Sequence, residues 1–159
     1  MEFAFTRFPF DPGEAIPSEH TCDGENVSPP LAWDGAPDGT ETFALIVDDP
    51  DAPGRTFTHW LCYNLPGDAA GLPRAVDFEM HFEGAEPAPE EGVNDFGNMG
   101  YGGPCPPPGD AAHRYFFRLY ALDTTLDLGP GATRNQLTDA MDGHVLDEED
   151  LVGVYGRSR

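Results

Sequence analysis

The sequence predicts an all-β fold, a β-sandwich with Greek-key connections and one short helix near the C-terminus. Its 19 glycines and 17 prolines divide the 159 residues into short segments, and this punctuation favours strands joined by turns over long helices. The apolar runs between these residues have the length and the aromatic and β-branched content of strands. Because 39% of the residues are hydrophobic, we expect one folded domain over residues 1–159.

Three apolar segments are expected to form the centre of the core. Residues Thr42–Val47 are a compact apolar run, as in a strand buried on both faces. Trp60–Leu65 is a second strand that a Pro-Gly pair ends, and Arg114–Leu122 is the longest and most aromatic of the three. The tail Leu151–Tyr155 resembles a last strand.

The single helix is expected near residue 135. Thr133 followed by Gln136 has the spacing of a capping box, in which each residue bonds to the backbone of the other. Leu137, Ala140 and Met141 would lie on one face of that helix and pack on the core. The pattern covers three turns or fewer.

A long connection, Glu83–Asp110, separates the second and third of these strands. Loops of this length in a compact domain are often functional. Its first half, Glu83–Gly92, is acidic and is expected to be a solvated excursion. Its second half, Asn94–Gly109, is rich in glycine and proline. Glycines let a backbone approach a ligand and offer N–H donors, and prolines stiffen the loop, so we expect a cradle for an oxyanion.

The charge of the chain restricts its partners. With 29 acidic residues against eight cations, all arginine, the formal net charge is -21. Such a surface repels phosphate backbones and anionic lipids, which excludes nucleic acid as a general partner. At about 1 M salt the Debye length falls to about 3 Å, so this self-repulsion is screened. We therefore expect the salt-rich cytosol of a halophile.

Membrane insertion is not expected, since no apolar stretch approaches the ~20 residues that span a bilayer. The start, Met1–Arg7, lacks a basic region followed by an apolar one. A cytoplasmic location is therefore the expectation.

The three cysteines, Cys22, Cys62 and Cys105, cannot all pair within one chain, and none stands in a CxxC motif. They indicate neither a disulfide scaffold nor a zinc ribbon. We expect reduced, buried thiols.

A pair of carboxylates follows the first central strand. Asp49 and Asp51 are two residues apart, so in an extended segment both side chains can point the same way. Pro50 stiffens the pair by restricting Asp49 and fixing its own φ. Such a pair can orient donors, share a proton or bind a cation, and it can also be an ordinary acidic turn.

Two histidines and a tyrosine stand at the starts of the other two strands. His59 precedes the Trp60 strand, and His113 and Tyr115 are two apart at the start of the third, so both can face one cavity. Each is a donor suited to a phosphate or carboxylate oxygen. His59 alone would more commonly be a structural core residue.

In these residues the sequence resembles the phosphatidylethanolamine-binding protein family, specifically its bacterial and archaeal branch described as Raf-kinase-inhibitor-like. The most specific matching stretches are Asp48–Pro53, Thr58–Trp60, Gly100–Pro104 with Pro106 and Pro107, and His113–Tyr115. Further agreement comes from Thr21–Gly24, Ser28–Leu31 with Trp33, Tyr120–Asp123 and Gly143–Leu146. The resemblance covers nearly the whole chain.

The resemblance implies two antiparallel sheets with an anion-binding cavity at one end, for phosphate or a phospholipid headgroup. It implies this set of ligand-binding residues: Asp49, Asp51, His59, Gly102, Gly103, Pro104, Cys105, Pro106, His113 and Tyr115. Phe57 departs from the pattern, because many relatives carry a tryptophan there. The kinase, transcription and protease partners of other members depend on surfaces that this short form is not expected to share.

The leading hypothesis is a binding protein for a small anion, with no cofactor, no metal and no catalytic residue, that also modulates a phosphorylated partner. In it the histidines, Tyr115 and the loop N–H groups donate to the anion, and the two aspartates orient the donors. One alternative is a hydrolase in which Asp, His and Tyr act as general acid and base, with Cys105 as the nearby nucleophile. Others are a Zn or Mn site built from both histidines and both aspartates, and an inhibitor of a protease or kinase. A homodimer is an open expectation.

Overall fold

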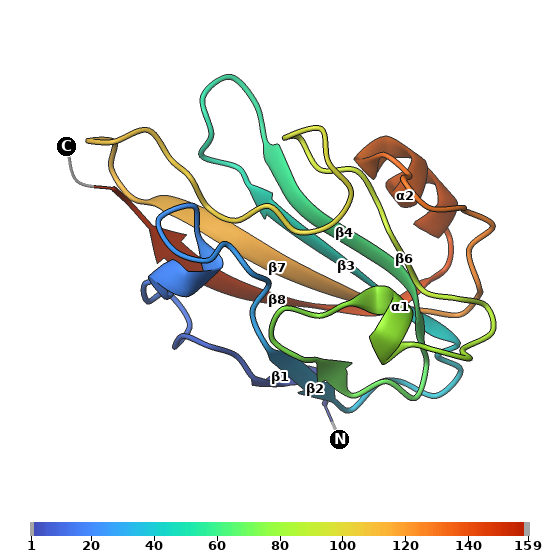
Figure 1. Cartoon of the computed structure of the whole chain (residues 1–159). Coiled ribbons are helices and arrows are strands. Elements are labelled where there is room, and N and C mark those ends of the chain that lie inside the picture. The colour runs from blue at the N-terminus through green and yellow to red at the C-terminus, as the bar shows by residue number, and fades with distance from the viewer. Residues whose placement is uncertain (1, 158–159) are drawn as a thin grey trace.

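The computed structural model describes residues 2–157 and shows two antiparallel sheets packed face to face (Figure 1). The smaller sheet has the order β1-β2-β5, with β1 Ala4–Arg7, β2 Leu31–Asp34 and β5 Gly71–Leu72. The larger has the order β6-β4-β3-β7-β8, with β6 Glu90–Glu91, β4 Phe57–Pro66, β3 Thr42–Asp49, β7 His113–Leu122 and β8 Val145–Tyr155. The predicted β-sandwich is confirmed.

The three predicted central strands are β3, β4 and β7, and they lie side by side. Every residue of β3 is buried, as its unbroken apolar run predicts. The strands run slightly further than the apolar runs, so that Asp49, Phe57 and His113 are strand ends. Because neighbouring strands are antiparallel, the end of β3 meets the starts of β4 and β7 at one edge of the molecule.

Two apolar clusters cover the two faces of the larger sheet. The cluster between the sheets includes Trp33, Phe43, Trp60 and Phe117. The cluster on the outer face is covered by α2, Arg134–Met141.

The predicted helix is α2, and its capping box is present. The Gln136 N–H donates to the Thr133 side chain at 3.2 Å, and the Thr133 N–H donates to the Gln136 side chain at 2.9 Å. Leu137 and Met141 are buried, as expected, and Ala140 is partly buried against the same cluster. The other helical segments are η1, Ser18–His20, and α1, Phe78–His81. Within the described residues no helix has the length and apolar character needed to cross a membrane.

A buried ion-pair network ties α2 to the larger sheet. Asp48 of β3 is fully buried on the side opposite Asp49. Its carboxylate accepts from Arg118 of β7 at 3.1 Å and pairs with Arg134 of α2 at 2.7 Å. Asp150 of β8 lies 3.8 Å from the same Arg118 but is 45% exposed.

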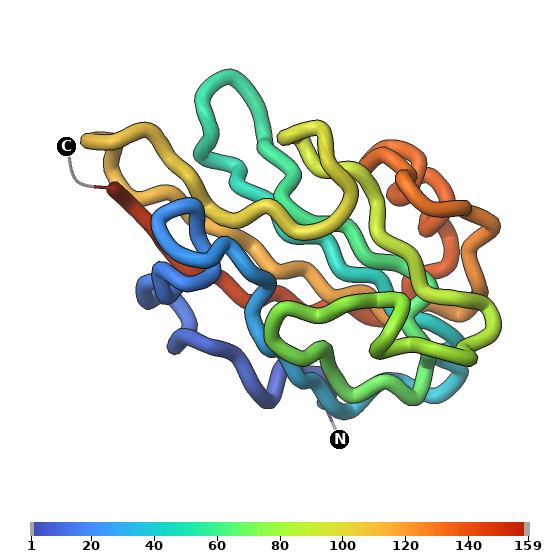
Figure 2. Tube along the Cα trace, viewed as in Figure 1, coloured from blue at the N-terminus to red at the C-terminus, as the bar shows by residue number. Residues whose placement is uncertain are grey.

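The expectation for the cysteines is wrong for two of the three. Cys22 and Cys105 form a disulfide with their Cα atoms 5.4 Å apart, and only Cys62 is a free, buried thiol. The disulfide joins the glycine- and proline-rich loop, yellow in Figure 2, to the segment that follows η1, drawn in blue. A separation of 83 residues carries no spacing signal, because only the fold brings the two side chains together.

Candidate functional site

A cavity of about 180 Å³ opens at the edge where β3 ends and where β4 and β7 begin. We call it the end cavity. Its walls are formed by Asp49, Ala52, Pro53, Phe57, His59, Phe96, Cys105, Pro106, Pro107, His113 and Tyr115. The fold thus brings together six of the ten predicted site residues: Asp49, His59, Cys105, Pro106, His113 and Tyr115.

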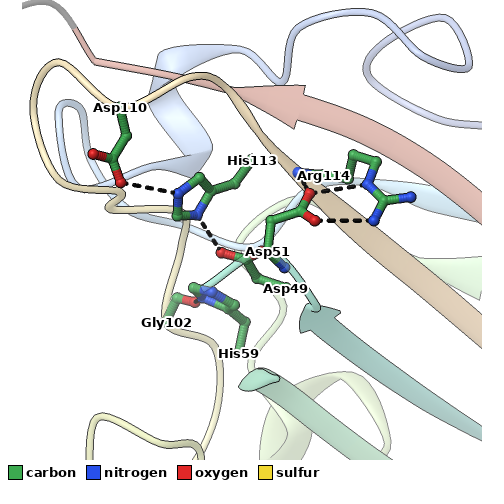
Figure 3. Close-up of polar contacts among 7 residues, drawn as sticks. All are labelled: Asp49, Asp51, His59, Gly102, Asp110, His113 and Arg114. Carbon is green, nitrogen blue, oxygen red and sulfur yellow. Dashed lines mark hydrogen bonds and ion pairs between the residues drawn. The ribbon is translucent and has the colours of Figure 1, made fainter. Parts of the chain in front are cut away.

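Asp49 and His113 form a buried ion pair in this cavity (Figure 3). The His113 Nδ1–H donates to Asp49 Oδ2 at 2.7 Å, and both residues are 5% exposed or less. The other oxygen of Asp49 accepts the backbone N–H of Asp51 at 2.8 Å. Because both oxygens are bonded, the carboxylate is fixed, and it fixes the imidazole in turn.

The surroundings of His113 favour its charged form. Burial acts to lower the pKa of its imidazole, but the hydrogen bond and the negative charge of Asp49, together with Asp110, outweigh burial and raise that pKa. The second ring nitrogen, Nε2, lies 3.4 Å from Asp110 Oδ2. Asp110 is a neighbour that the sequence reasoning did not identify.

His59 reaches the end cavity through a β-bulge. Thr58 pairs with Asp48 and Trp60 pairs with Val47, so His59 is the extra residue of β4. Its Nδ1 lies 2.6 Å from the Gly102 carbonyl. A carbonyl only accepts, so Nδ1 carries the proton of the neutral ring and Nε2 remains an acceptor.

Burial lowers the pKa of His59, against opposing effects from the Gly102 carbonyl and nearby aspartates. The ring lies among aromatic neighbours, with centroids at 4.9 Å from Phe57, 5.5 Å from Phe96 and 5.3 Å from Tyr115. The expected role of His59 as a donor to the anion therefore needs a correction. Neutral His59 has no N–H left for a ligand, and it donates from Nε2 only after that nitrogen takes up a proton.

Tyr115 brings a hydroxyl group to the cavity. Its ring packs against His59 and stacks on His113 at 6.4 Å between centroids. Burial, followed by the charge of Asp49, raises the pKa of the hydroxyl well above its ordinary value, so it stays protonated. Among residues 2–157 it has no hydrogen-bond partner within the chain, which leaves it free to donate to a ligand.

Asp51 is not part of the cavity wall, contrary to the prediction. Its carboxylate accepts the backbone N–H of Arg114 at 2.9 Å and two guanidinium N–H groups, also at 2.9 Å (Figure 3). These bonds from Arg114 lower the pKa of Asp51 to about 2. Asp49 and Asp51 therefore do not share a proton or a cation, because each has a separate cationic partner.

Two N–H groups of the predicted oxyanion cradle, those of Gly102 and Gly103, are bonded inside the protein. The Gly102 N–H donates to the His59 carbonyl at 3.0 Å, and the Gly103 N–H donates to the Asn26 side chain at 2.8 Å. Pro104 has no N–H, and none of these three residues borders the cavity. The loop instead positions His59, through the Gly102 carbonyl. Gly103 has no room for a side chain, because a Cβ there would lie 2.2 Å from the His20 carbonyl oxygen.

The rest of the wall is apolar, and most of it escaped the sequence reasoning. Ala52, Pro53, Phe57, Phe96 and Pro107 supply this surface. Phe96 is 47% exposed in a loop next to glycine, and an aromatic residue in such a place is a signal that could have been used. Cys105 borders the cavity as half of a disulfide, so it offers no thiolate nucleophile.

Comparison with known proteins settles the family. The family model described as phosphatidylethanolamine-binding protein matches residues 6–156. The chain belongs to this family.

Relatives of the phosphatidylethanolamine-binding protein family align along nearly the whole chain. A UPF0098 protein of Methanothermobacter thermautotrophicus is 54% identical over 145 residues, which is 89% of this chain and 91% of the relative. The Aquifex aeolicus UPF0098 protein is 44% identical, over 93% of this chain and 85% of its own.

Among solved structures, YbcL of Escherichia coli, described as a new member of the mammalian family, superposes with a TM-score of 0.88 at 32% identity. The superposition covers 98% of this chain and 99% of YbcL. A Chlamydia trachomatis homologue of phosphatidylethanolamine-binding proteins gives a TM-score of 0.84 at 37% identity, over 98% of both chains.

For the metal hypothesis, the described part of this member of the phosphatidylethanolamine-binding protein family offers no preformed site. Over residues 2–157, no three His, Cys, Asp or Glu side chains are arranged to hold a metal ion. Of the four proposed ligands, Asp51 is held by Arg114, and the Asp49 oxygens are occupied by His113 and a backbone N–H.

The two cavity histidines are expected to titrate on opposite sides of the ordinary imidazole pKa of about 6.5. His113 should titrate above it and His59 below it. Since the folded pKa of His113 is raised, its stabilising contribution is complete below the unfolded pKa and is lost as pH rises through the folded pKa. Nitrogen-15 NMR of the ring resonances measures both values. His113 titrating below His59 would contradict the assigned contacts.

Proposed function

We propose that this chain is a non-enzymatic binding protein that takes the anionic group of a small ligand into the end cavity. The observation that carries the proposal is the buried His113–Asp49 pair, which shares with Tyr115 a cavity whose other walls are mainly apolar. Inside such walls the effective dielectric constant is low, so hydrogen bonds to an anion are stronger than at an exposed surface.

The ligand is proposed to be a phosphoryl or carboxyl group with a short apolar substituent. The donors Tyr115 and His113 lie at the start of β7, and the faces of Phe57, Phe96 and the prolines form the remaining wall. A volume of about 180 Å³ fits a group of this size and not a whole lipid. A phosphorylated side chain of a protein partner presents the same group, so a phosphopeptide belongs among the ligands to be tested.

Binding fits the residues better than hydrolysis does. The cavity holds acid and base groups, but its only cysteine is in a disulfide, and Asp49 is bonded at both oxygens. A carboxylate that is hydrogen-bonded at both oxygens is suited to orienting His113 and not to attacking a substrate. Turnover of nitrophenyl phosphate or nitrophenyl acetate would favour the hydrolase alternative instead.

Calorimetry tests the proposal with phosphate, phenyl phosphate, acetate, phosphoethanolamine and a phosphoserine peptide, in molar potassium chloride. His113→Gln removes the charge but retains an N–H for Asp49, and it should weaken binding by about tenfold or more, as expected for a charge-assisted bond. Tyr115→Phe should weaken it by about threefold to tenfold without a change in melting temperature.

The matched control is His144→Ala, since His144 is an exposed histidine paired with Asp123 at the far end of β7. It should leave affinity unchanged. If the folded wild-type protein binds none of the five ligands, the proposed function is wrong. Equal affinities for wild type and His113→Gln would show that the anion binds outside the end cavity.

A further inference from the structure

We propose that Asp110 is a built-in competitor for the anion and lowers the affinity of the end cavity for phosphoryl and carboxyl ligands alike. The Asp110 carboxylate and an incoming anion compete for the same N–H of His113. This inference rests on the proposed function and adds to it a residue that regulates the affinity of the site.

The competition follows from the number of donors on His113. An imidazolium ring has two N–H groups, and Asp49 occupies the one at Nδ1 with a bond of 2.7 Å inside the protein. A ligand can therefore use only Nε2. Asp110 Oδ2 is 3.4 Å from that nitrogen, so the chain already places a carboxylate where the anion would bind.

A ligand can displace the Asp110 carboxylate from His113 more easily than it can displace the Asp49 carboxylate. Asp49 is buried and bonded at both oxygens. The Asp110 side chain is 44% exposed, and its contact with His113 is longer than the 2.7–3.2 Å, or so, of a strong bond. Two hydrogen bonds hold the backbone at Asp110. The Asp110 N–H donates to the Pro107 carbonyl at 3.2 Å, and the neighbouring Gly109 N–H donates to the Arg157 carbonyl at 2.9 Å. Rotation of the side chain alone would free Nε2.

The penalty falls on every anion that uses Nε2. Each ligand has to displace the same Asp110 carboxylate, so the apparent affinity of a carboxylate and that of a phosphoryl group fall by the same factor. A ligand that also bonds to Tyr115 regains part of this loss. Asp110 therefore lowers the affinity of the end cavity for both classes of anion.

The test compares inorganic phosphate and acetate as probes of wild type, Asp110→Asn and Asp110→Ala by calorimetry. A pH of about 5.5, one unit below the ordinary imidazole pKa, keeps His113 charged in all three proteins. Both variants should bind phosphate and acetate more tightly, each by about threefold to tenfold, from the loss of a competing charge-assisted bond. Asp68→Asn, an equal charge change at the other end of β4, should alter neither affinity.

Three results would overturn this role. If wild type binds phosphate and neither Asp110 variant binds it more tightly, Asp110 does not compete, although the proposed function stands. If no protein binds either anion, this inference fails, and the proposed function fails with it only if the other three ligands do not bind either. Ring NMR gives an independent readout, because removal of Asp110 should lower the His113 pKa if the contact exists in solution. An unchanged value would also exclude the competition.

Discussion

Replacing Asp48 with asparagine is expected to lower the free energy of unfolding by about 3 kcal/mol. The substitution keeps the shape of a fully buried side chain but removes the charge that holds two arginines, Arg118 and Arg134. Breaking a buried ion pair from one side leaves the partner charges uncompensated. Because both arginines are partly exposed, at 25% and 33%, the loss should lie at the lower end of the range for buried pairs. Urea unfolding in molar salt measures it.

The control for Asp48 is Asp150→Asn. Asp150 approaches the same Arg118, but at 3.8 Å and with 45% of its side chain exposed, so its removal should cost less than about 1 kcal/mol. A comparable loss for both variants would show that general charge, and not the buried network, stabilises α2 on the sheet.

Removing the Cys22–Cys105 disulfide is expected to cost about 4–5 kcal/mol of stability in the chain-entropy model. The bridge closes a loop of 83 residues, so the unfolded chain gains much freedom when it opens. The Cys22→Ala/Cys105→Ala double variant and the reduced wild-type protein should unfold at similar, lower denaturant concentrations. The double variant should not respond to reductant, since its remaining cysteine, Cys62, has no partner.

Counting thiols checks the pairing itself. Alkylation of denatured, unreduced protein should modify one cysteine, and modification of three would refute the bridge. Disulfides persist mainly in oxidising compartments, so the same count in fresh cell lysate tests the expected cytoplasmic location. An intact bridge there would argue against that location.

The regular core could be predicted because its signals are local. The run Thr42–Val47, the aromatic segment before Leu122 and the Thr133–Gln136 box each lie within a few consecutive residues. The smaller sheet could not be predicted in this way, since β1, β2 and β5 have four residues or fewer and depend on pairing with distant segments. The acidic first half of β8 likewise gave no apolar pattern, because it is an exposed strand at the edge of the sheet.

The candidate site likewise has residues that the sequence could predict and contacts that it could not. Asp49, His113 and Tyr115 stand at strand ends that the sequence marks, and antiparallel pairing brings those ends together. The partners of Asp51 and of the loop N–H groups could not be predicted, because residue spacing does not show which donor meets which acceptor. In the fold, Asp51 bonds to Arg114 and the Gly103 N–H bonds to the Asn26 side chain.

By itself, the sequence determined the sandwich architecture, the acidic surface and the family, since composition, periodicity and motifs are properties of neighbouring residues. The tertiary structure decided which side chains reach the cavity and in what state. A bulge directs His59 inward, a disulfide ties Cys105 to Cys22, and Asp110 lies against His113. These features depend on register and on contacts between segments far apart in the chain, which no local pattern encodes.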